Sequence, residues 1–151
     1  MKVDFMRWVD RCIGVPVCFL LSIFVSIERF FGLRKVKDGF KPKKILFVEL
    51  SEMGSTILAY SAMKKAKELF NAELYFMIFK ENEASVKLLD IIPKENMITI
   101  RSKSLFLFFI DTISAIFKMR SKKIDTVLDL ELFSRFTSVL GFFSGAKAIV
   151  G

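Results

Sequence analysis

Residues 44–79, KILFVELSEMGSTILAYSAMKKAKELFNAELYFMIF, decide the fold of this 151-residue chain. Residues 44–50 form a largely apolar run, which is typical of a strand that is covered on both faces. In residues 56–70 apolar side chains recur at helical spacing and lysines take the other face, which predicts a helix packed on a sheet. Residues 73–79 predict a second strand. Strand, helix and strand in this order predict a right-handed unit of a parallel sheet.

The same alternation continues to the end of the chain. Asn82 can cap a helix that runs toward Pro93. Further strands are predicted at residues 97–100 and 126–131, helices at 104–119 and 133–143, and the beginning of a strand at 145–151. The predicted fold class is therefore α/β, a Rossmann-like doubly wound parallel sheet. Because the last strand has no closing helix after it, we expect a truncated gene, a fragment or a half-molecule.

The first 38 residues have a different character from the rest. The apolar run at residues 12–27, CIGVPVCFLLSIFVSI, is followed by a densely basic segment at residues 29–44. A basic cluster next to an apolar segment is typical of a cytoplasmic membrane flank. The run is shorter than the roughly 20 residues that span a bilayer, so it would span with help from the next residues or lie in the interface.

We therefore predict two parts, a membrane anchor at residues 1–38 and a Rossmann-like domain at residues 39–151. A cleaved signal peptide and a helix that only packs on the domain remain alternatives for the first part. The side chains predicted to contact the membrane are Phe19, Leu20, Leu21, Ile23, Phe24, Phe30 and Phe31.

Composition narrows the possible partners. A formal net charge of +8 favours anionic lipid, nucleic acid or a phosphorylated ligand. Because the charge is concentrated beside an apolar segment, we predict an anionic membrane surface and no nucleic acid as partner. The chain has no histidine and only Cys12 and Cys18, which excludes a histidine-based zinc site, a histidine base and a disulfide framework. We expect no metal and no cofactor.

Ligands of a doubly wound sheet bind outside the carboxyl ends of its strands, so residues 49–55 and 129–135 are the candidate site segments. Gly54 would allow a tight turn, and the amides of Ser55, Thr56 and Ile57 would form a helix start that favours an anionic group. The segment contains neither a dinucleotide-binding fingerprint nor a P-loop. An ordinary turn with a serine cap is the alternative interpretation.

Residues 44–79 and 124–151 together resemble the N-terminal half of the ADP-heptose:lipopolysaccharide heptosyltransferases, glycosyltransferase family nine. The family opens with an apolar strand, a Ser-x-x-Gly-Asp turn and an apolar helix, here with SEMGS at residues 51–55. An Asp-x-x-Leu-Asp strand, a basic helix start and a Gly-Ala-Lys-x-x-x-Gly ending follow in the family's order. The resemblance implies the N-terminal, acceptor-binding half of a GT-B fold, with the nucleotide sugar bound by a C-terminal half.

The resemblance implies a function in sugar transfer, from a nucleotide diphosphosugar to a lipid-linked lipopolysaccharide core acceptor. Transfer would take place on the cytoplasmic face of the inner membrane, and 151 residues alone would be inactive. The alternative is a non-catalytic, membrane-bound module that binds an acceptor or a partner.

The resemblance also assigns residues. Gly54 matches the family's turn glycine and Arg135 the basic residue that meets the acidic, phosphorylated inner core; Thr56 adds a third acceptor-binding candidate. The family's turn aspartate, which acts as the base, falls at Ser55, and an unassisted serine hydroxyl cannot accept that proton at neutral pH. Glu52, in the same turn, can substitute, so Glu52 and Ser55 are the catalytic candidates.

Two further features of the sequence have open interpretations. Glu49 and Glu131, at predicted strand ends, are additional candidates for the base, with a solvated or salt-bridged carboxylate as the structural alternative. The 18 phenylalanines of the chain could reflect a compositional bias. Alternatively, Phe106, Phe108 and Phe109 could enter the membrane interface near the lipid of the acceptor.

Overall fold

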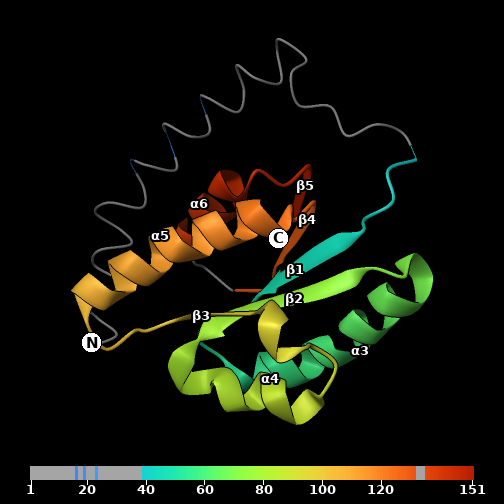
Figure 1. The fold of residues 1–151 in the computed structure, drawn as a ribbon, viewed down its shortest axis with the longest axis horizontal. Helices are drawn as coiled ribbons and strands as arrows, with labels where there is room; N and C mark the ends of the chain where they lie inside the picture. The colour runs from blue at the N-terminus through green and yellow to red at the C-terminus, as the bar shows by residue number, and fades with distance from the viewer. Residues whose placement is uncertain (1–15, 17–18, 20–22, 24–38, 132–134) are drawn as a thin grey trace.

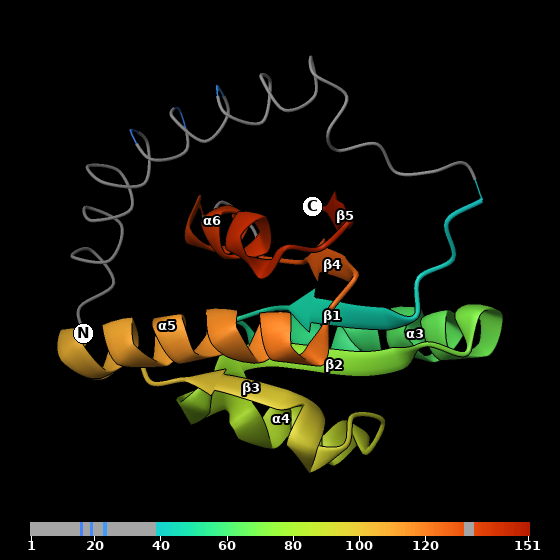
Figure 2. The ribbon, with the colours of Figure 1, turned by 45° about the horizontal axis from the view of Figure 1, so that its top comes forward.

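The computed structural model of the protein describes residues 16, 19, 23, 39–131 and 135–151. Within these residues, five parallel strands form one sheet in the order β3-β2-β1-β4-β5 (Figure 2). The strands are β1 (Lys44–Val48), β2 (Glu73–Phe79), β3 (Met97–Ile100), β4 (Thr126–Asp129) and β5 (Ala148–Val150). The helices between them are α3 (Met53–Phe70), α4 (Glu83–Leu89), α5 (Leu105–Lys122) and α6 (Arg135–Ser144), with short 3-10 helices η2 (Lys80–Asn82) and η3 (Lys94–Asn96). The predicted parallel α/β sheet is confirmed.

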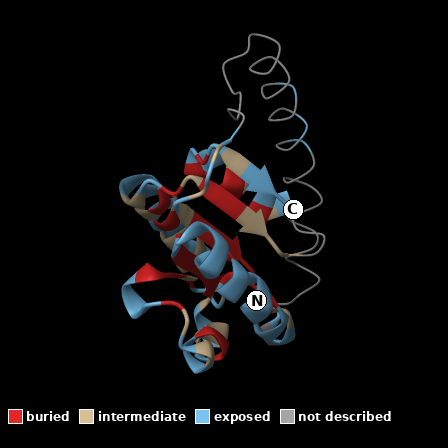
Figure 3. Ribbon diagram, turned by 90° about the vertical axis from the view of Figure 1, so that its right-hand side faces the viewer, coloured by how far each residue is buried: buried red, intermediate tan, exposed pale blue. Residues whose placement is uncertain are grey.

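The sheet is covered on both faces, as the apolar strand sequences predicted. Helices α3 and α4 lie on one side of it and α5 and α6 on the other (Figure 1). Side chains of β1 alternate between the layers: Ile45 and Phe47 join the core beneath α3, whereas Leu46 and Val48 join the core beneath α5. Figure 3 shows the buried residues concentrated in the strands and on the inner faces of the helices.

The beginning of α3 differs from the prediction. The helix begins at Met53, three residues before the predicted start, and the extended Glu52 is its N-cap residue. Gly54 is therefore a residue of the first helical turn, and the prediction that it forms a tight turn between strand and helix is wrong. A β carbon at Gly54 would meet nothing within 4 Å, so neither its backbone nor its surroundings require a glycine.

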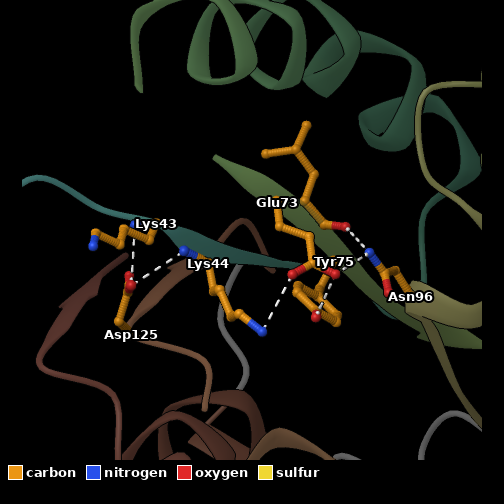
Figure 4. A network of polar contacts seen from close by, with 7 residues as sticks. Lys43, Lys44, Glu73, Tyr75, Asn96 and Asp125 are labelled. Carbon is orange, nitrogen blue, oxygen red and sulfur yellow. Dashed lines mark hydrogen bonds and ion pairs between the residues drawn. The ribbon is translucent and has the colours of Figure 1, made fainter. Parts of the chain in front are cut away.

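A polar network joins the strands at their amino ends (Figure 4). The Oδ2 atom of Asp125 accepts hydrogen bonds from the amides of Lys43 (3.0 Å) and Lys44 (3.1 Å), which ties the beginning of β4 to the beginning of β1. Glu73 accepts a hydrogen bond from the hydroxyl of Tyr75 at 2.8 Å, and this bond is the main reason why the pKa of Glu73 is lowered. This edge of the sheet therefore has a structural role.

Replacing Asp125 with alanine should lower the free energy of unfolding by about 2 kcal/mol, because two amides at the start of β1 lose a charged acceptor. Urea denaturation followed by circular dichroism measures the change. Glu95→Ala removes an exposed carboxylate near the same edge and should change stability by less than about 0.5 kcal/mol. Equal stability of both variants would show that the Asp125 bonds do not hold the two strands together.

The predicted membrane anchor falls almost entirely outside the described residues. Of its predicted membrane side chains, Phe19 and Ile23 are described; both are helical and exposed, to 66% and 45%. Leu20, Leu21, Phe24, Phe30 and Phe31 lie outside the described residues. Among the described residues, none of the helices combines the length and apolar character that crossing a bilayer requires.

Candidate functional site

The topology places a candidate site between β1 and β4. From β1 the chain crosses through α3 to β2, and after β3 it crosses through α5, on the other face of the sheet, to β4. Strands β1 and β4 are neighbours, with Val48 paired to Asp129 at their carboxyl ends. In open α/β sheets, the edge where the direction of crossing reverses is where ligands bind. The segments after Val48 and Asp129 therefore meet at the edge that sequence analysis selected.

Two side chains from other elements hold the segment between β1 and α3. Glu131 Oε2 accepts hydrogen bonds from the amides of Leu50 (2.7 Å) and Ser51 (3.1 Å), and Glu131 Oε1 accepts one from the Ser51 hydroxyl. Asn82 Nδ2 donates to the carbonyl oxygens of Leu50 (3.2 Å) and Ser51 (2.9 Å). Asn82 is the N-cap residue of α4, as predicted, but its side chain makes no cap hydrogen bond and binds this segment instead.

Glu49 is a buried carboxyl beneath the same segment. Its side chain is only 2% exposed, and its Oε1 accepts a hydrogen bond from the Glu52 amide at 3.2 Å. Burial, followed by the negative charge of Glu131, raises the pKa of Glu49 from 4.5 to about 7. A hydrogen bond between the two carboxyl groups also favours the protonated form. Near neutral pH, the pKa of about 7 leaves Glu49 partly protonated.

Asp129 extends this group of carboxyls along the edge. Its Oδ1 accepts a hydrogen bond from the Glu131 amide at 3.2 Å. Burial raises the pKa of Asp129, and a hydrogen bond from Thr137 opposes the shift. Asp129 therefore positions the segment after β4 as Glu49 positions the segment after β1.

The two predicted catalytic side chains lie together at the beginning of α3. Ser55 Oγ donates a hydrogen bond to Glu52 Oε2 at 3.0 Å, and Glu52 is exposed. Gly54 lies between them in the sequence and is also exposed. An exposed carboxylate that is oriented by a hydroxyl can accept a proton from a bound molecule, whereas Glu49 is too buried to contact one. Of these two carboxyls, Glu52 is therefore the one that a bound molecule can reach.

Thr56 does not occupy the position that sequence analysis expected. It is fully buried, its amide donates to the Glu52 carbonyl at 3.3 Å, and its hydroxyl donates to the same oxygen at 3.2 Å. The prediction that its amide faces a ligand is wrong, since α3 begins earlier than expected. The first N–H groups of a helix have no carbonyl partner within the helix. In α3 these groups include the amides of Met53, Gly54 and Ser55.

Arg135 is the first residue of α6 and is exposed. It lies six positions after Asp129, on the segment that leaves β4 at the carboxyl edge, so the fold brings it to the same edge as the start of α3. Across the described ranges, His, Cys, Asp and Glu side chains form no group of three or more that is arranged to hold a metal ion.

Sequence reasoning missed how this edge is held together. Glu49 and Glu131 are candidates by their positions at strand ends, but their contact follows from the register of β1 against β4. The signal that was available is that both follow apolar strands of a predicted parallel sheet. For Asn82, whose partners are more than 30 positions away, no local signal exists.

Comparison with known proteins supports the fold. No family model matches the chain and no curated protein matches it. Among solved structures, it is similar to a crystal structure described as the glycosyl transferase family 9 from Veillonella parvula DSM 2008, with 16% sequence identity and a TM-score of 0.62. The match covers 76% of this chain and 33% of that one, so this chain spans about a third of its length. In fold, the chain is the counterpart of part of a glycosyl transferase family 9 protein.

Proposed function

We propose that this chain is the acceptor-binding part of a glycosyltransferase. The reaction is the transfer of a sugar, such as a heptose, from a nucleotide diphosphosugar to a lipid-linked lipopolysaccharide core saccharide. The observation that carries the proposal is the exposed Glu52–Ser55 pair at the beginning of α3, on the edge between β1 and β4. The similarity in fold to a glycosyl transferase family 9 protein supports the same class of reaction.

In this proposal, Glu52 is the base that removes the proton from the acceptor hydroxyl. Ser55 donates a hydrogen bond that fixes the carboxylate, and the amide of Gly54 in the first turn of α3 faces an anionic group of the acceptor. Arg135 binds a phosphate or carboxylate of the acceptor, because a guanidinium pairs with such groups through two parallel hydrogen bonds. Glu49, Glu131 and Asn82 hold the backbone around them.

The remaining parts of the reaction lie beyond the described residues. The nucleotide sugar would be bound by a further domain of the enzyme, as in the GT-B architecture that the sequence resembles. Residues 1–38 would attach the chain to the cytoplasmic face of the inner membrane, where the acceptor is anchored. The apolar run and its basic flank support this part of the proposal.

Arg135→Ala should weaken binding of a phosphorylated inner-core oligosaccharide about tenfold, since a paired guanidinium is lost. Isothermal titration calorimetry with the full chain measures the Kd. Lys94→Ala removes the same charge at the amino edge of the sheet, just before β3, and should leave the Kd within about twofold. Equal losses in both variants would mean that the oligosaccharide responds only to net charge, and that Arg135 has no specific role.

A non-catalytic binding module is the second candidate. The observation in its favour is that Ser55, at the position where the resembling family carries an aspartate, is a hydrogen-bond donor to Glu52. This candidate predicts oligosaccharide binding without transfer, even when a nucleotide-sugar-binding domain is supplied. Transfer that depends on Glu52 would exclude it.

A further inference from the structure

Helix α5 carries an apolar stripe on the face that points away from the sheet. Ala115 and Met119 lie in the core, whereas Phe106, Ile110, Ile113 and Phe117 recur at intervals of four, three and four residues and are exposed. Phe106 is 73% and Phe117 69% exposed. Leu105 and Phe109 border this stripe and are exposed too. The stripe therefore runs along nearly the whole length of an 18-residue helix.

Of the three phenylalanines that sequence analysis grouped together, Phe108 does not belong to this surface. Its ring centroid lies 4.9 Å from that of Phe136 in α6 and 6.3 Å from that of Phe79 at the end of β2. These ring contacts fix the orientation of α5 on the sheet. With Phe108 facing inward, Phe106 and Phe109 face outward.

Charges at the two ends of the helix indicate what covers the stripe. Lys103 lies just before α5, and Arg120 and Lys123 lie at its end; all three are exposed. Arg120 Nε donates a hydrogen bond to the Phe143 carbonyl at 2.9 Å. Because a carbonyl oxygen carries no formal charge, this bond does not neutralise the positive charge of Arg120. The sequence of α5 contains one carboxylate, Asp111, and Arg101 binds it at 2.7 Å. An apolar stripe between cationic ends, without a free carboxylate, fits the surface of an anionic bilayer.

The same charges disfavour the other possible occupants. In an antiparallel pair of α5 helices from two copies, Lys103 of each would approach the cationic end of the other, and a parallel pair would align like charges directly. The segments on both sides of the apolar run at residues 12–27 contain more lysines and arginines than carboxylates, so their net positive charge would be repelled by these ends as well.

We propose that the outer face of α5 lies in the interface of an anionic membrane, as a second contact independent of residues 1–38. The apolar stripe enters the acyl boundary, and Lys103, Arg120 and Lys123 contact lipid phosphates. Because α5 begins after the carboxyl end of β3, the stripe begins at the edge of the sheet where the candidate site lies. This inference concerns lipid contact alone, so its failure would leave the acceptor-binding proposal intact.

A fluorescent probe on the full chain tests this contact directly. With Cys12 and Cys18 replaced by serine, a polarity-sensitive dye is attached to Ser114→Cys, which is exposed on α5 beside the stripe, or to Ser61→Cys, which is exposed on α3 across the sheet. Vesicles of phosphatidylglycerol and phosphatidylcholine carry a spin-labelled lipid as quencher. The dye at position 114 should lose more than half of its emission, and the dye at position 61 should lose little.

Two variants separate the parts of the surface. Phe106→Gln combined with Phe117→Gln should raise the lipid concentration for half-maximal quenching at position 114 at least tenfold, and unchanged thermal unfolding would show that the fold persists. For the protein without these two substitutions, vesicles of phosphatidylcholine alone should raise the lipid concentration for half-maximal quenching at position 114 by a similar factor. Equal quenching at positions 114 and 61 would overturn the proposal. The proposal would also be overturned if the dye at position 114 were shielded from water before vesicles are added. A second copy of the chain or residues 1–38 would then cover the stripe.

Discussion

Glu52→Gln should lower the kcat of sugar transfer roughly 10²- to 10⁴-fold, which is the usual contribution of a positioned general base. The assay uses the chain fused to the nucleotide-sugar-binding domain of a glycosyl transferase family 9 protein, with a lipopolysaccharide core acceptor. Glutamine can still accept the hydrogen bond from the Ser55 hydroxyl, so the start of α3 keeps its geometry. Because only the basicity of the side chain is lost, KM for the acceptor should change little.

Two further variants make this result specific. Glu68→Gln removes an exposed carboxylate near the other end of α3 and should leave kcat unchanged. Ser55→Asp, introduced together with Glu52→Gln, returns a carboxylate to the first turn of the helix and should recover part of the rate. Unchanged turnover in Glu52→Gln would remove Glu52 from the mechanism, and the absence of transfer in the unsubstituted fusion would favour the binding module.

Glu49→Gln should stabilise the protein above pH 8 and leave its stability nearly unchanged at pH 4. The pKa of Glu49 is about 7 in the folded protein against 4.5 as its ordinary value, so the folded state binds more protons between these two pH values. The free energy of unfolding therefore falls as the pH rises through this range, by about 3 kcal/mol for a shift of this size. Glutamine can accept from the Glu52 amide and donate to Glu131 at every pH, and it avoids this loss.

Urea unfolding of both proteins between pH 4 and pH 9 measures the difference. Glu95→Gln, which removes an exposed carboxylate, should run parallel to the unsubstituted protein at every pH. If Glu49→Gln also ran parallel, Glu49 would titrate as an ordinary carboxyl, and the carboxyl pair would not be what holds the segment after β1.

The architecture of this protein is predictable because its sequence signals are local. Apolar runs such as residues 45–48 and helical spacing such as Met63 and Ala66 depend only on neighbouring positions. Short crossings account for the neighbouring pairs β1–β2, β2–β3 and β4–β5, whereas the longer crossing that places β4 beside β1 has no local signal in the sequence. The comparison with a solved structure agrees with the resemblance that the sequence suggested, at the level of the fold.

The details of the candidate site were less predictable. The start of α3 was placed too late because Glu52 is not among the residues that usually cap helices, so no signal marked the true boundary. The pairing of Glu49 with Glu131 depends on the register between β1 and β4, and the contact of Asn82 with Leu50 joins residues more than 30 positions apart. Such contacts are set by tertiary packing.

The proposed function requires that the carboxyl edge between β1 and β4 bind a phosphorylated saccharide acceptor. Amide chemical shifts of the ¹⁵N-labelled full chain, titrated with a lipopolysaccharide inner-core oligosaccharide, test it most directly. We predict that the largest changes fall in residues 50–55 at the start of α3 and in residues 129–137 after β4. Changes confined to the amino edge, around Lys44 and Asn96, or no saturable change at all, would show that the acceptor does not bind at the carboxyl edge.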